Sequence, residues 1–209
     1  MQGAGGREVS SIKGVGDPPR QTAQFDASWR ARCFIQHATA GDTREMVARH
    51  YLGKPPGVVV CRLAMVADVM PVGCCIFALP PRETSQRYGG ETWELARLWI
   101  ADEVPSNAET WLIGQAVRHV RTIHPHVEVL VSYADPAAGH EGVIYRAANW
   151  RLDGRTDDER KTPRFDYRYA GRMYSRAGHL PPGAQPERVP RVSKRRFVYQ
   201  IREVLPSPG

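Results

Sequence analysis

VEVLVSYADPAAGHEGVIYRAANWRLDG, residues Val127 to Gly154, is the stretch that decides the fold. It opens with an apolar, β-branched run from Val127 to Val131, which predicts a buried strand. Polar and titratable side chains follow at once, and a short helical run then carries Tyr145 and ends at Trp150. In open α/β sheets, ligands bind just beyond the carboxyl ends of buried strands. The stretch therefore predicts a strand, a polar loop at a binding site, and a short helix.

The rest of the chain predicts strands and helices in alternation around this stretch. Apolar runs bounded by turn residues indicate strands, and apolar residues at helical spacing indicate helices. The expected strands are 32–39, 58–65, 72–79, 92–100, a short segment after Trp150, 165–169 and 195–202, and the expected helices are 42–52, 107–122 and a short run from 142. Residues 80–90 are expected to form a polar loop. Taken alone, these periods predict only a mixture of α and β structure.

Length and composition favour one domain with extensions. The chain has 209 residues, of which 42% are hydrophobic, enough for a real core. It has no apolar stretch of about 18 residues and no apolar segment of the kind that directs secretion, so no membrane association is expected. The expected divisions are a flexible Gly/Ser/Pro-rich leader at 1–28, a main domain at 29–178, a Pro/Gly-rich linker at 179–190, and a basic strand at 191–209 that completes the sheet.

The cysteines indicate a reducing compartment. No two of them form a C-x-x-C pair, and three of the four lie inside apolar runs that resemble strands. They are Cys33, Cys61, Cys74 and Cys75. We expect buried free thiols in a cytoplasmic protein, because their spacing is not that of a zinc site built from cysteines.

The positive charge is concentrated at one end of the chain. Residues 151–209 contain fourteen Lys and Arg against seven Asp and Glu, whereas residues 1–150 contain fifteen of each. Aromatic residues are interleaved with these arginines. Guanidinium groups match phosphates and aromatic faces stack on bases, so the pattern favours a nucleic-acid surface over a merely solvated tail. The positions expected to contact DNA are Arg164, Arg168, Lys194, Arg195 and Arg196.

The opening stretch resembles the last motif of GNAT-type acyltransferases. In that motif a helical tyrosine is followed four and five residues later by Gly-Phe, and here the residues are Tyr145, Asn149 and Trp150. The order of the predicted elements is similar as well. The resemblance implies a GNAT-like α/β fold, with a mixed, mostly antiparallel central sheet flanked by helices.

Within this class the chain resembles the Mom-type DNA-modification proteins of bacteriophages. Three pieces carry the likeness, namely ARHY at Ala48–Tyr51, ELARLWIADE at Glu94–Glu103 and SYADPAAGHEGVIYRAANW at Ser132–Trp150, and it spans roughly residues 32–202. The resemblance implies an enzyme that adds an acetamido (carbamoylmethyl) group to adenine N6 in DNA and so protects it from host restriction. It implies double-stranded DNA as partner and the cytoplasm of the host cell as location, and it leaves a homodimer open.

The donor site departs from the usual GNAT pattern. Ordinary members carry a Gly-rich loop whose backbone amides hold the CoA pyrophosphate at a helix N-terminus. Here the segment 104–110 contains no glycine, and Glu109 would repel phosphate. The resemblance implies acetyl-CoA or another acyl or carbamoyl donor, and it leaves a requirement for iron open, with no metal ligands assigned. The residues expected to bind the donor are Leu98, Ile100, Ser106, Asn107, Thr110 and Ser132.

Two catalytic candidates lie in the opening stretch on either side of its loop. The resemblance implies that Tyr145 protonates the departing thiolate as a general acid; the alternative is a core tyrosine with a satisfied hydroxyl. Asp135 follows the buried strand and precedes Pro136, so its carboxylate can point into the cleft and take a proton from the adenine amine. The alternative for Asp135 is the cap of a local turn.

Three further candidates complete the expected site. His140, in a Gly-His-Glu-Gly loop, is either a base or metal ligand or a neighbour of a helix N-cap. His50 ends the first long helix and either borders the acceptor site or simply favours the helix dipole. Arg97 lies among apolar residues of a central strand, so it either binds phosphate or pairs with Asp135.

Two other functions remain open on the sequence. One is a GNAT acyltransferase with a protein or small-molecule acceptor, whose basic tail attracts an acidic substrate. The other is a DNA-binding protein that keeps the GNAT scaffold without catalysis.

Overall fold

The computed structural model describes residues 25–88, 91–158, 160–175 and 177–202. No helix in these ranges is long and apolar enough to cross a membrane. The first 24 residues of the expected leader lie outside the described part of the chain. The last four residues of that expected leader are ordered, since Phe25 packs against the core and Asp26 bonds the backbone N–H and hydroxyl of Ser28.

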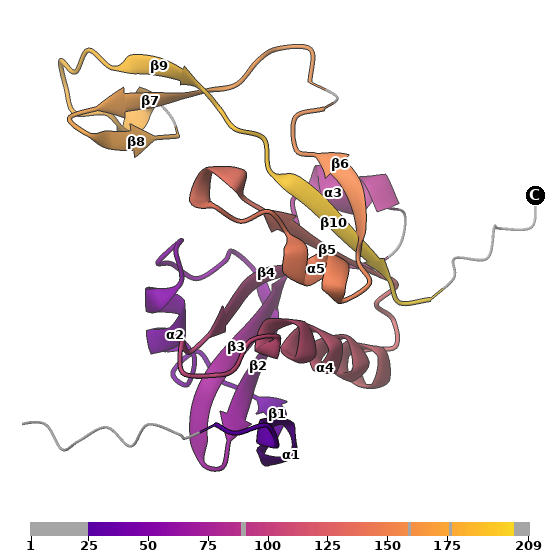
Figure 1. Ribbon diagram of the computed structural model, residues 1–209. Helices are drawn as coiled ribbons and strands as arrows, with labels where there is room; N and C mark the ends of the chain where they lie inside the picture. Colours follow the sequence, from indigo (N-terminus) through magenta and orange to yellow (C-terminus); the bar gives the residue numbers. More distant parts are fainter. Residues whose placement is uncertain (1–24, 89–90, 159, 176, 203–209) are drawn as a thin grey trace, which may run out of the picture.

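A seven-stranded sheet forms the centre of the molecule, with strand order β1-β2-β3-β4-β5-β10-β6 (Figure 1). Within the described residues, only the β4–β5 pair of this sheet is parallel, and all other neighbouring strands are antiparallel. The expected mixed, mostly antiparallel sheet is therefore confirmed. Its strands are β1 (Cys33–His37), β2 (Val59–Ala67), β3 (Met70–Ala78), β4 (Thr92–Ile100), β5 (Val129–Ala134), β6 (Arg151–Arg155) and β10 (Arg195–Gln200).

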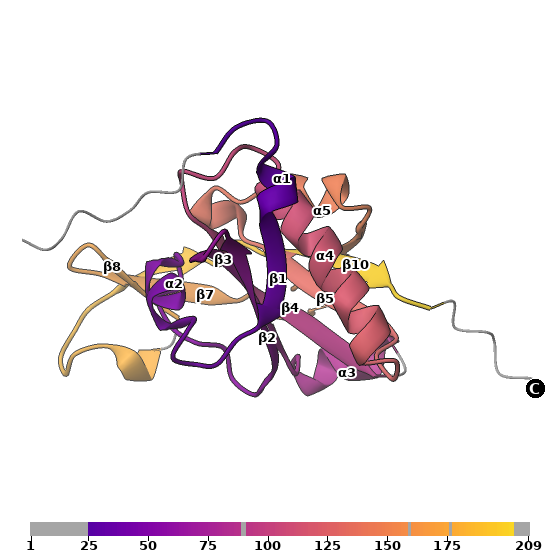
Figure 2. The ribbon, with the colours of Figure 1, turned by 90° about the horizontal axis from the view of Figure 1, so that it is seen from below.

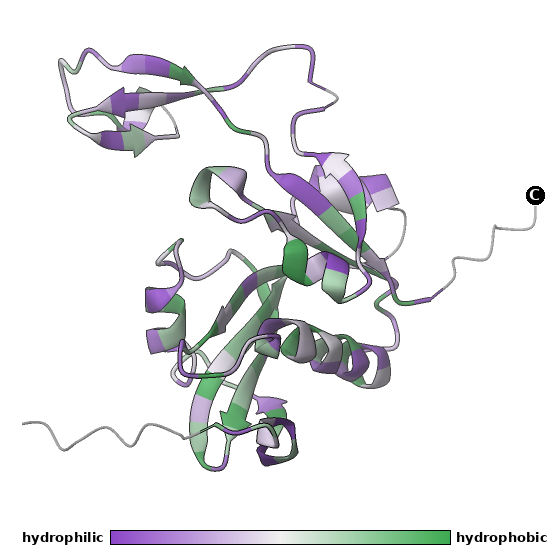
Figure 3. Ribbon diagram, in the orientation of Figure 1, coloured by the Kyte–Doolittle hydropathy of each residue, from purple (hydrophilic) through white to green (hydrophobic). Residues whose placement is uncertain are grey.

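Helices cover both faces of this sheet. On one face, α4 (Ala108–Ile123), α5 (Val143–Ala147) and the short α1 (Trp29–Arg32) pack on the main core, and Figure 2 shows them side by side. On the other face, α2 (Arg44–Arg49) packs against Cys74, Ile76 and Trp99. Figure 3 shows hydrophobic residues concentrated on the strands that lie between these helices. Each strand of the sheet centre is thus buried on two sides, which explains the continuous apolar runs of β2 and β3.

Two segments differ from expectation because their secondary structure is too polar to show in the sequence. The expected loop 80–90 contains helix α3 (Arg82–Tyr88), which has no fully buried residue. The expected linker 179–190 ends in strand β9 (Glu187–Pro190), so it is not a linker along its whole length. This strand pairs with β7 (Phe165–Tyr169), which pairs in turn with β8 (Arg172–Tyr174), and the three form a small second sheet that projects from the main body (Figure 1).

The expected C-terminal strand lies inside the main sheet. β10 inserts between β5 and β6 and pairs antiparallel with both. The chain thus leaves the central sheet after β6, builds the small sheet, and returns as β10 (Figure 1). The basic segment therefore consists of two parts, one exposed on the small sheet and one built into the core.

A bulge in the middle of β4 changes the face of the sheet to which its side chains point. Ile76 pairs with Arg97 and the next residue, Phe77, pairs with Leu95, so Ala96 is an extra residue on β4. A bulge of this kind reverses the alternation of faces beyond it. Accordingly Leu95 packs with the main core, whereas Trp99 packs with α2 on the opposite face.

Candidate functional site

The two parallel strands separate after a short paired segment, and the candidate site lies in the opening. β4 and β5 pair only from Thr92 to Glu94 on one side and from Val129 to Val131 on the other. Beyond Glu94, β4 keeps β3 as its neighbour but has no strand partner on the β5 side within the described chain. A cavity of about 610 Å³ fills this opening, between the end of α2, the second half of β4, and the loop and helix that follow β5.

Tyr145 lines this cavity. Its ring is buried against Phe197 and Trp150, with centroids 5.2 and 5.5 Å away. Its hydroxyl is 2.8 Å from Oγ of Ser132, and that Oγ is also 2.8 Å from the carbonyl oxygen of Leu95. Because a carbonyl only accepts, the single Ser132 proton goes to Leu95, and the Tyr145 hydroxyl donates to Ser132. Burial raises the pKa of Tyr145 to about 12, so the phenol keeps its proton at neutral pH.

Two charged residues of β4 lie on the same cavity wall. Arg97 is buried and donates from Nε to the carbonyl oxygen of Lys54, 2.9 Å away, and from Nη1 to that of Ala96, 2.5 Å away. The expected alternative of a pair with Asp135 is therefore not what the structure contains. Glu94 is half-buried in the same wall, and burial raises its pKa, against the lowering influence of Arg97.

Three rings form a row along one side of the cavity. Tyr51 lies between His50 and His140, with ring centroids 4.5 and 4.8 Å from theirs. His50 Nδ1 accepts a hydrogen bond from the Leu52 backbone N–H at 3.2 Å, which places the imidazole proton on Nε2. Burial, with a contribution from the Arg97 charge, lowers the pKa of His50 to about 4. His50 is thus neutral at pH 7 and presents a donor.

Asp135 is held by other groups at the rim. Its carboxylate accepts the Ala137 backbone N–H at 3.1 Å and lies 3.0 Å from Lys194 Nζ. The local turn cap that the sequence left open is thus present. Lys194 itself lines the cavity, whereas Asp135 does not. Asp135 therefore positions Lys194 in the free protein.

The expected donor residues divide into two groups. Leu98 and Ile100 line the cavity on β4, and Ser132 lies behind Tyr145. Ser106, Asn107 and Thr110 are not among the lining residues; the start of α4 contributes Glu109 instead. Asn107 is the N-cap of α4 in a left-handed conformation, with φ 72°, and makes no side-chain capping bond. Of the expected donor residues, then, only those on β4 face the opening.

All five cations expected to contact DNA are paired with carboxylates. Arg195 pairs with Glu141, and Arg196 with Asp153, which also binds the Tyr88 hydroxyl at 2.7 Å. The Arg196 side chain is only 11% exposed, so little of its surface is available to a phosphate in the free protein, and its contact with DNA stays a prediction. The other pairs are Arg164 with Asp157, Arg168 with Glu187 and Lys194 with Asp135.

Sequence reasoning missed two residues of the site. Glu94 could have been found from the sequence. Like Arg97, it is a charged side chain among the apolar residues of β4, and such a side chain must have a partner or face a cavity. Tyr51 carried no such signal, since an aromatic residue next to a helix end is common. Its place between His50 and His140 depends on a loop almost 90 residues away in the chain.

Known proteins similar to this chain agree with the fold. Residues 32–179 match the Mom protein family. Methylcarbamoylase Mom of Escherichia phage Mu is 39% identical over 131 residues, which cover 60% of this chain and 50% of that protein. The chain thus spans about half the length of this curated relative.

Solved structures with the same architecture are acetyltransferases. The ribosomal-protein-S5-alanine acetyltransferase of Vibrio fischeri has a TM-score of 0.52 at 7% identity and covers 84% of this chain and 96% of its own. A Bacillus subtilis acetyltransferase in complex with CoA has a TM-score of 0.50 at 10% identity, with coverages of 81% and 97%. The protein belongs to the Mom protein family and has the fold of GNAT acetyltransferases.

Proposed function

We propose that this protein is a phage-type DNA modification enzyme that acylates the N6 amine of adenine from a CoA-linked acyl or carbamoyl donor, as the step toward an acetamido-type group on N6. The observation that carries the proposal is Tyr145, a buried tyrosine that keeps its proton, because burial raises its pKa to about 12, and that lines the cavity between the separated strands. Membership of the Mom family supports the kind of group that is added, since the phage Mu relative is named a methylcarbamoylase. DNA as the acceptor is part of the proposal and is supported by the resemblance to phage DNA-modification proteins. The modified DNA would resist restriction enzymes that read adenine edges.

The free edge of β4 is the proposed donor site. A bound thioester would supply an activated carbonyl carbon: the bond from adenine N6 to this carbon forms as the carbon–sulfur bond breaks, and the thiolate leaves. This step gives an N6-acyl adenine. A carbamoylmethyl group is joined to N6 through its CH2 carbon, so that product requires a further conversion that is not part of this step. The backbone of β4 beyond Glu94 faces the cavity without a strand partner in the described chain, so its amides and carbonyls can hydrogen-bond an extended ligand arm. At the start of α4, the negative charge of Glu109 would repel a pyrophosphate. This end of the cavity is therefore poorly suited to bind the CoA pyrophosphate in the way usual for GNAT enzymes.

Tyr145 is the proposed general acid. A phenol with a pKa near 12 holds its proton until a thiolate departs beside it. When the proton leaves, the hydroxyl of Ser132 can turn from Leu95 to the new phenolate, since its oxygen is within hydrogen-bond distance of both. Ser132 is thus a positioning residue that stabilises the charged form of Tyr145.

Glu94 is the proposed general base. Its raised pKa makes it a stronger base than an ordinary carboxylate, and it lines the same cavity as Tyr145. The aromatic amine of adenine is a poor nucleophile, so removal of a proton during attack is needed. His50 serves this role less well, because its Nδ1 lone pair is already used by Leu52.

The small sheet is the proposed DNA contact. Arg168 lies on its central strand β7 and Arg164 directly precedes that strand; about half of each side chain is exposed, and each forms a surface ion pair. Such pairs contribute less than about 1 kcal/mol, so phosphates can displace the carboxylates. The target adenine must leave the duplex stack to reach a cavity, at a cost of a few kcal/mol, and phosphate contacts by these arginines would offset that cost.

Nucleoside mass spectrometry tests the proposal. The protein is expressed in bacteria with a plasmid, and the plasmid is digested to nucleosides. We expect a new deoxyadenosine-derived mass, with its yield reduced by about 10²- to 10⁴-fold in Tyr145→Phe and in Glu94→Gln. The mass also identifies the group, because direct acetyl transfer and addition of an acetamido group give different nucleosides.

Tyr199→Phe is the matched control. This half-buried tyrosine on β10 loses only a hydroxyl bonded to Arg121, away from the cavity, and should retain the full yield. Unmodified DNA from well-folded wild-type protein would overturn the proposal. Acylated host proteins in the same cells would then favour the acyltransferase with another acceptor.

A further inference from the structure

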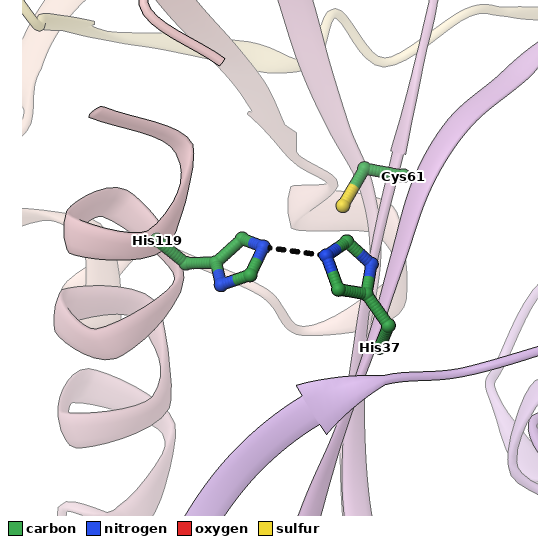
Figure 4. Close-up of side chains that lie close together, drawn as sticks. All are labelled: His37, Cys61 and His119. Atoms are coloured by element: carbon green, nitrogen blue, oxygen red, sulfur yellow. Dashed lines mark hydrogen bonds between the residues drawn. The ribbon is translucent and has the colours of Figure 1, made fainter. Parts of the chain in front are cut away.

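A cluster of three metal-binding side chains lies outside the cavity. Within the described residues, His37, Cys61 and His119 are the one group whose His, Cys, Asp or Glu ligand atoms gather closely, all within 4.8 Å of one another. Figure 4 shows the imidazole of His119 reaching from α4 toward that of His37, with the sulfur of Cys61 beside them. The two Nε2 atoms are 3.1 Å apart. None of the three residues lines the proposed active site.

A fourth side chain nearby has an unsatisfied nitrogen. His124, the residue after α4, has its Nε2 buried without a hydrogen-bond partner in the described chain. Its ring centroid is 6.5 Å from that of His37 and 6.2 Å from that of His119. A buried polar atom without a partner costs about 1–3 kcal/mol, and a bound metal ion can satisfy such a nitrogen by accepting its lone pair. This observation is independent of the three-residue cluster and lies next to it.

We propose that His37, Cys61 and His119 bind one divalent transition-metal ion, of which Zn²⁺ fits best, with His124 or a water molecule as fourth ligand. Two imidazoles and one thiolate form a donor set that Zn²⁺ favours over Mg²⁺ or Ca²⁺, which prefer oxygen. Tetrahedral bonds of about 2.0–2.3 Å separate ligand atoms by roughly 3.3–3.8 Å. The cluster needs only small rotations to reach these distances.

The surroundings allow such an ion to enter and to bind. His37 is exposed and gives a path from solvent, whereas Cys61 is buried. The pKa of His119 is lowered by burial and by His37, which favours the neutral imidazole that a metal requires. Burial raises the pKa of Cys61 to about 11, so binding must release the thiol proton to solvent as the metal–sulfur bond forms.

The proposed role of the ion is to join three elements of the fold. His37 ends β1, Cys61 lies on β2, and His119 lies in the second half of α4. The ligands thus connect the edge of the main sheet to the helix whose first turn borders the cavity. A metal here would stabilise the native state without contacting the substrate.

Cobalt(II) spectroscopy on the full chain tests the site. Protein freed of metal by a chelator is titrated with Co²⁺, whose bonds to sulfur give a charge-transfer absorption. We expect saturation at one equivalent, with this band and the visible bands of a tetrahedral ion, and loss of both on adding Zn²⁺. His37→Gln should weaken binding on the order of a hundredfold or more, and because His37 is exposed this variant should still fold.

The cysteine variants decide which sulfur binds. Cys61→Ser should lose the charge-transfer band, whereas Cys33→Ser, which changes another buried free cysteine, should keep it. Zn²⁺ should also raise the Tm of the wild type and of Cys33→Ser but not of His37→Gln. The proposal is overturned if the wild type binds no Co²⁺ at one equivalent, if the bound ion shows no sulfur band, or if His37→Gln binds as tightly as the wild type.

Discussion

For single residues, the sequence predicts that a side chain has an unusual environment, but it does not predict which group that side chain contacts. Arg97, Tyr145 and Ser132 could be predicted as unusual, because a polar side chain inside an apolar run must find a partner or face a cavity. Their partners could not be predicted. Asp135 pairs with Lys194, which directly precedes β10, and Arg97 donates to the carbonyl of Lys54 in the loop after α2; both partners approach from distant parts of the chain.

His50, one of two histidines that line the cavity, couples protein stability to pH. His50 titrates with a pKa of about 4 in the folded protein and of about 6.5 when unfolded. Between these values the unfolded state binds a proton that the native state does not, so stability is present above pH 6.5 and is lost as the pH falls toward 4. We expect the Tm, followed by a fluorescent dye, to decrease over this range, and His50→Gln to decrease less.

The control for this pH effect is an exposed histidine. His179→Gln changes a side chain on the small projecting region and should leave the wild-type pH profile of the Tm in place. Equal slopes for His50→Gln and wild type would show that other groups, such as His119 and His124 with their lowered pKa values, account for the acid sensitivity.

Elements with apolar faces were predicted well, and polar ones were not. The expected strand 92–100 coincides with β4, and the expected helix 107–122 differs from α4 by one residue at each end, because both bury regular apolar faces. α3 and β9 escaped prediction, since neither buries a residue fully and neither shows a period. The bulge at Ala96 was also invisible, because it depends on the register with β3.

The start of α5 depends on a glycine that packs closely. Gly142 has φ 78°, and a Cβ there would lie 2.2 Å from the ring of Phe197, on the strand β10 that supports Tyr145. Gly142→Ala therefore combines backbone strain with overpacking of the core. We expect a loss of roughly 2–4 kcal/mol in the free energy of unfolding, measured by urea denaturation, together with a loss of DNA modification.

Gly139 separates the two causes. It has the same φ of 78°, but a Cβ there would meet nothing within 4 Å. Gly139→Ala should cost only about 1 kcal/mol, so the difference between the variants measures the contact with Phe197. Equal losses would mean that the ring of Phe197 moves aside freely and that the packing does not fix α5.

At the scale of the whole molecule, the positive charge is concentrated in one part of the chain, but not all of these side chains are exposed to solvent. The surplus of positive charge lies after residue 150, as the sequence shows. The structure divides these residues between the main sheet and the small projecting sheet (Figure 1). Arg196 belongs to the first group and is nearly covered, whereas Arg164 and Arg168 belong to the exposed region. Net charge alone therefore overestimates the positively charged surface that the described residues expose.

The salt dependence of DNA binding distinguishes these two groups of arginines. Each phosphate contact contributes about 0.9 to the slope of log K against log salt concentration. The double variant Arg164→Gln, Arg168→Gln should therefore make this negative slope less steep, by up to about 1.8. The slope is measured by fluorescence anisotropy of a labelled duplex in increasing KCl. The fold of the double variant should be unchanged, because exposed ion pairs contribute little to stability.

Arg196→Gln should give the opposite result. Its guanidinium donates to the Asp153 carbonyl at 2.8 Å and lies 3.4 Å from the Asp153 carboxylate, so its removal should lower the urea midpoint by an amount equivalent to about 1–3 kcal/mol. Its salt slope should equal that of the wild type. An unchanged slope in the double variant together with a reduced slope in Arg196→Gln would place the DNA on the main sheet, and the small sheet would then need another role.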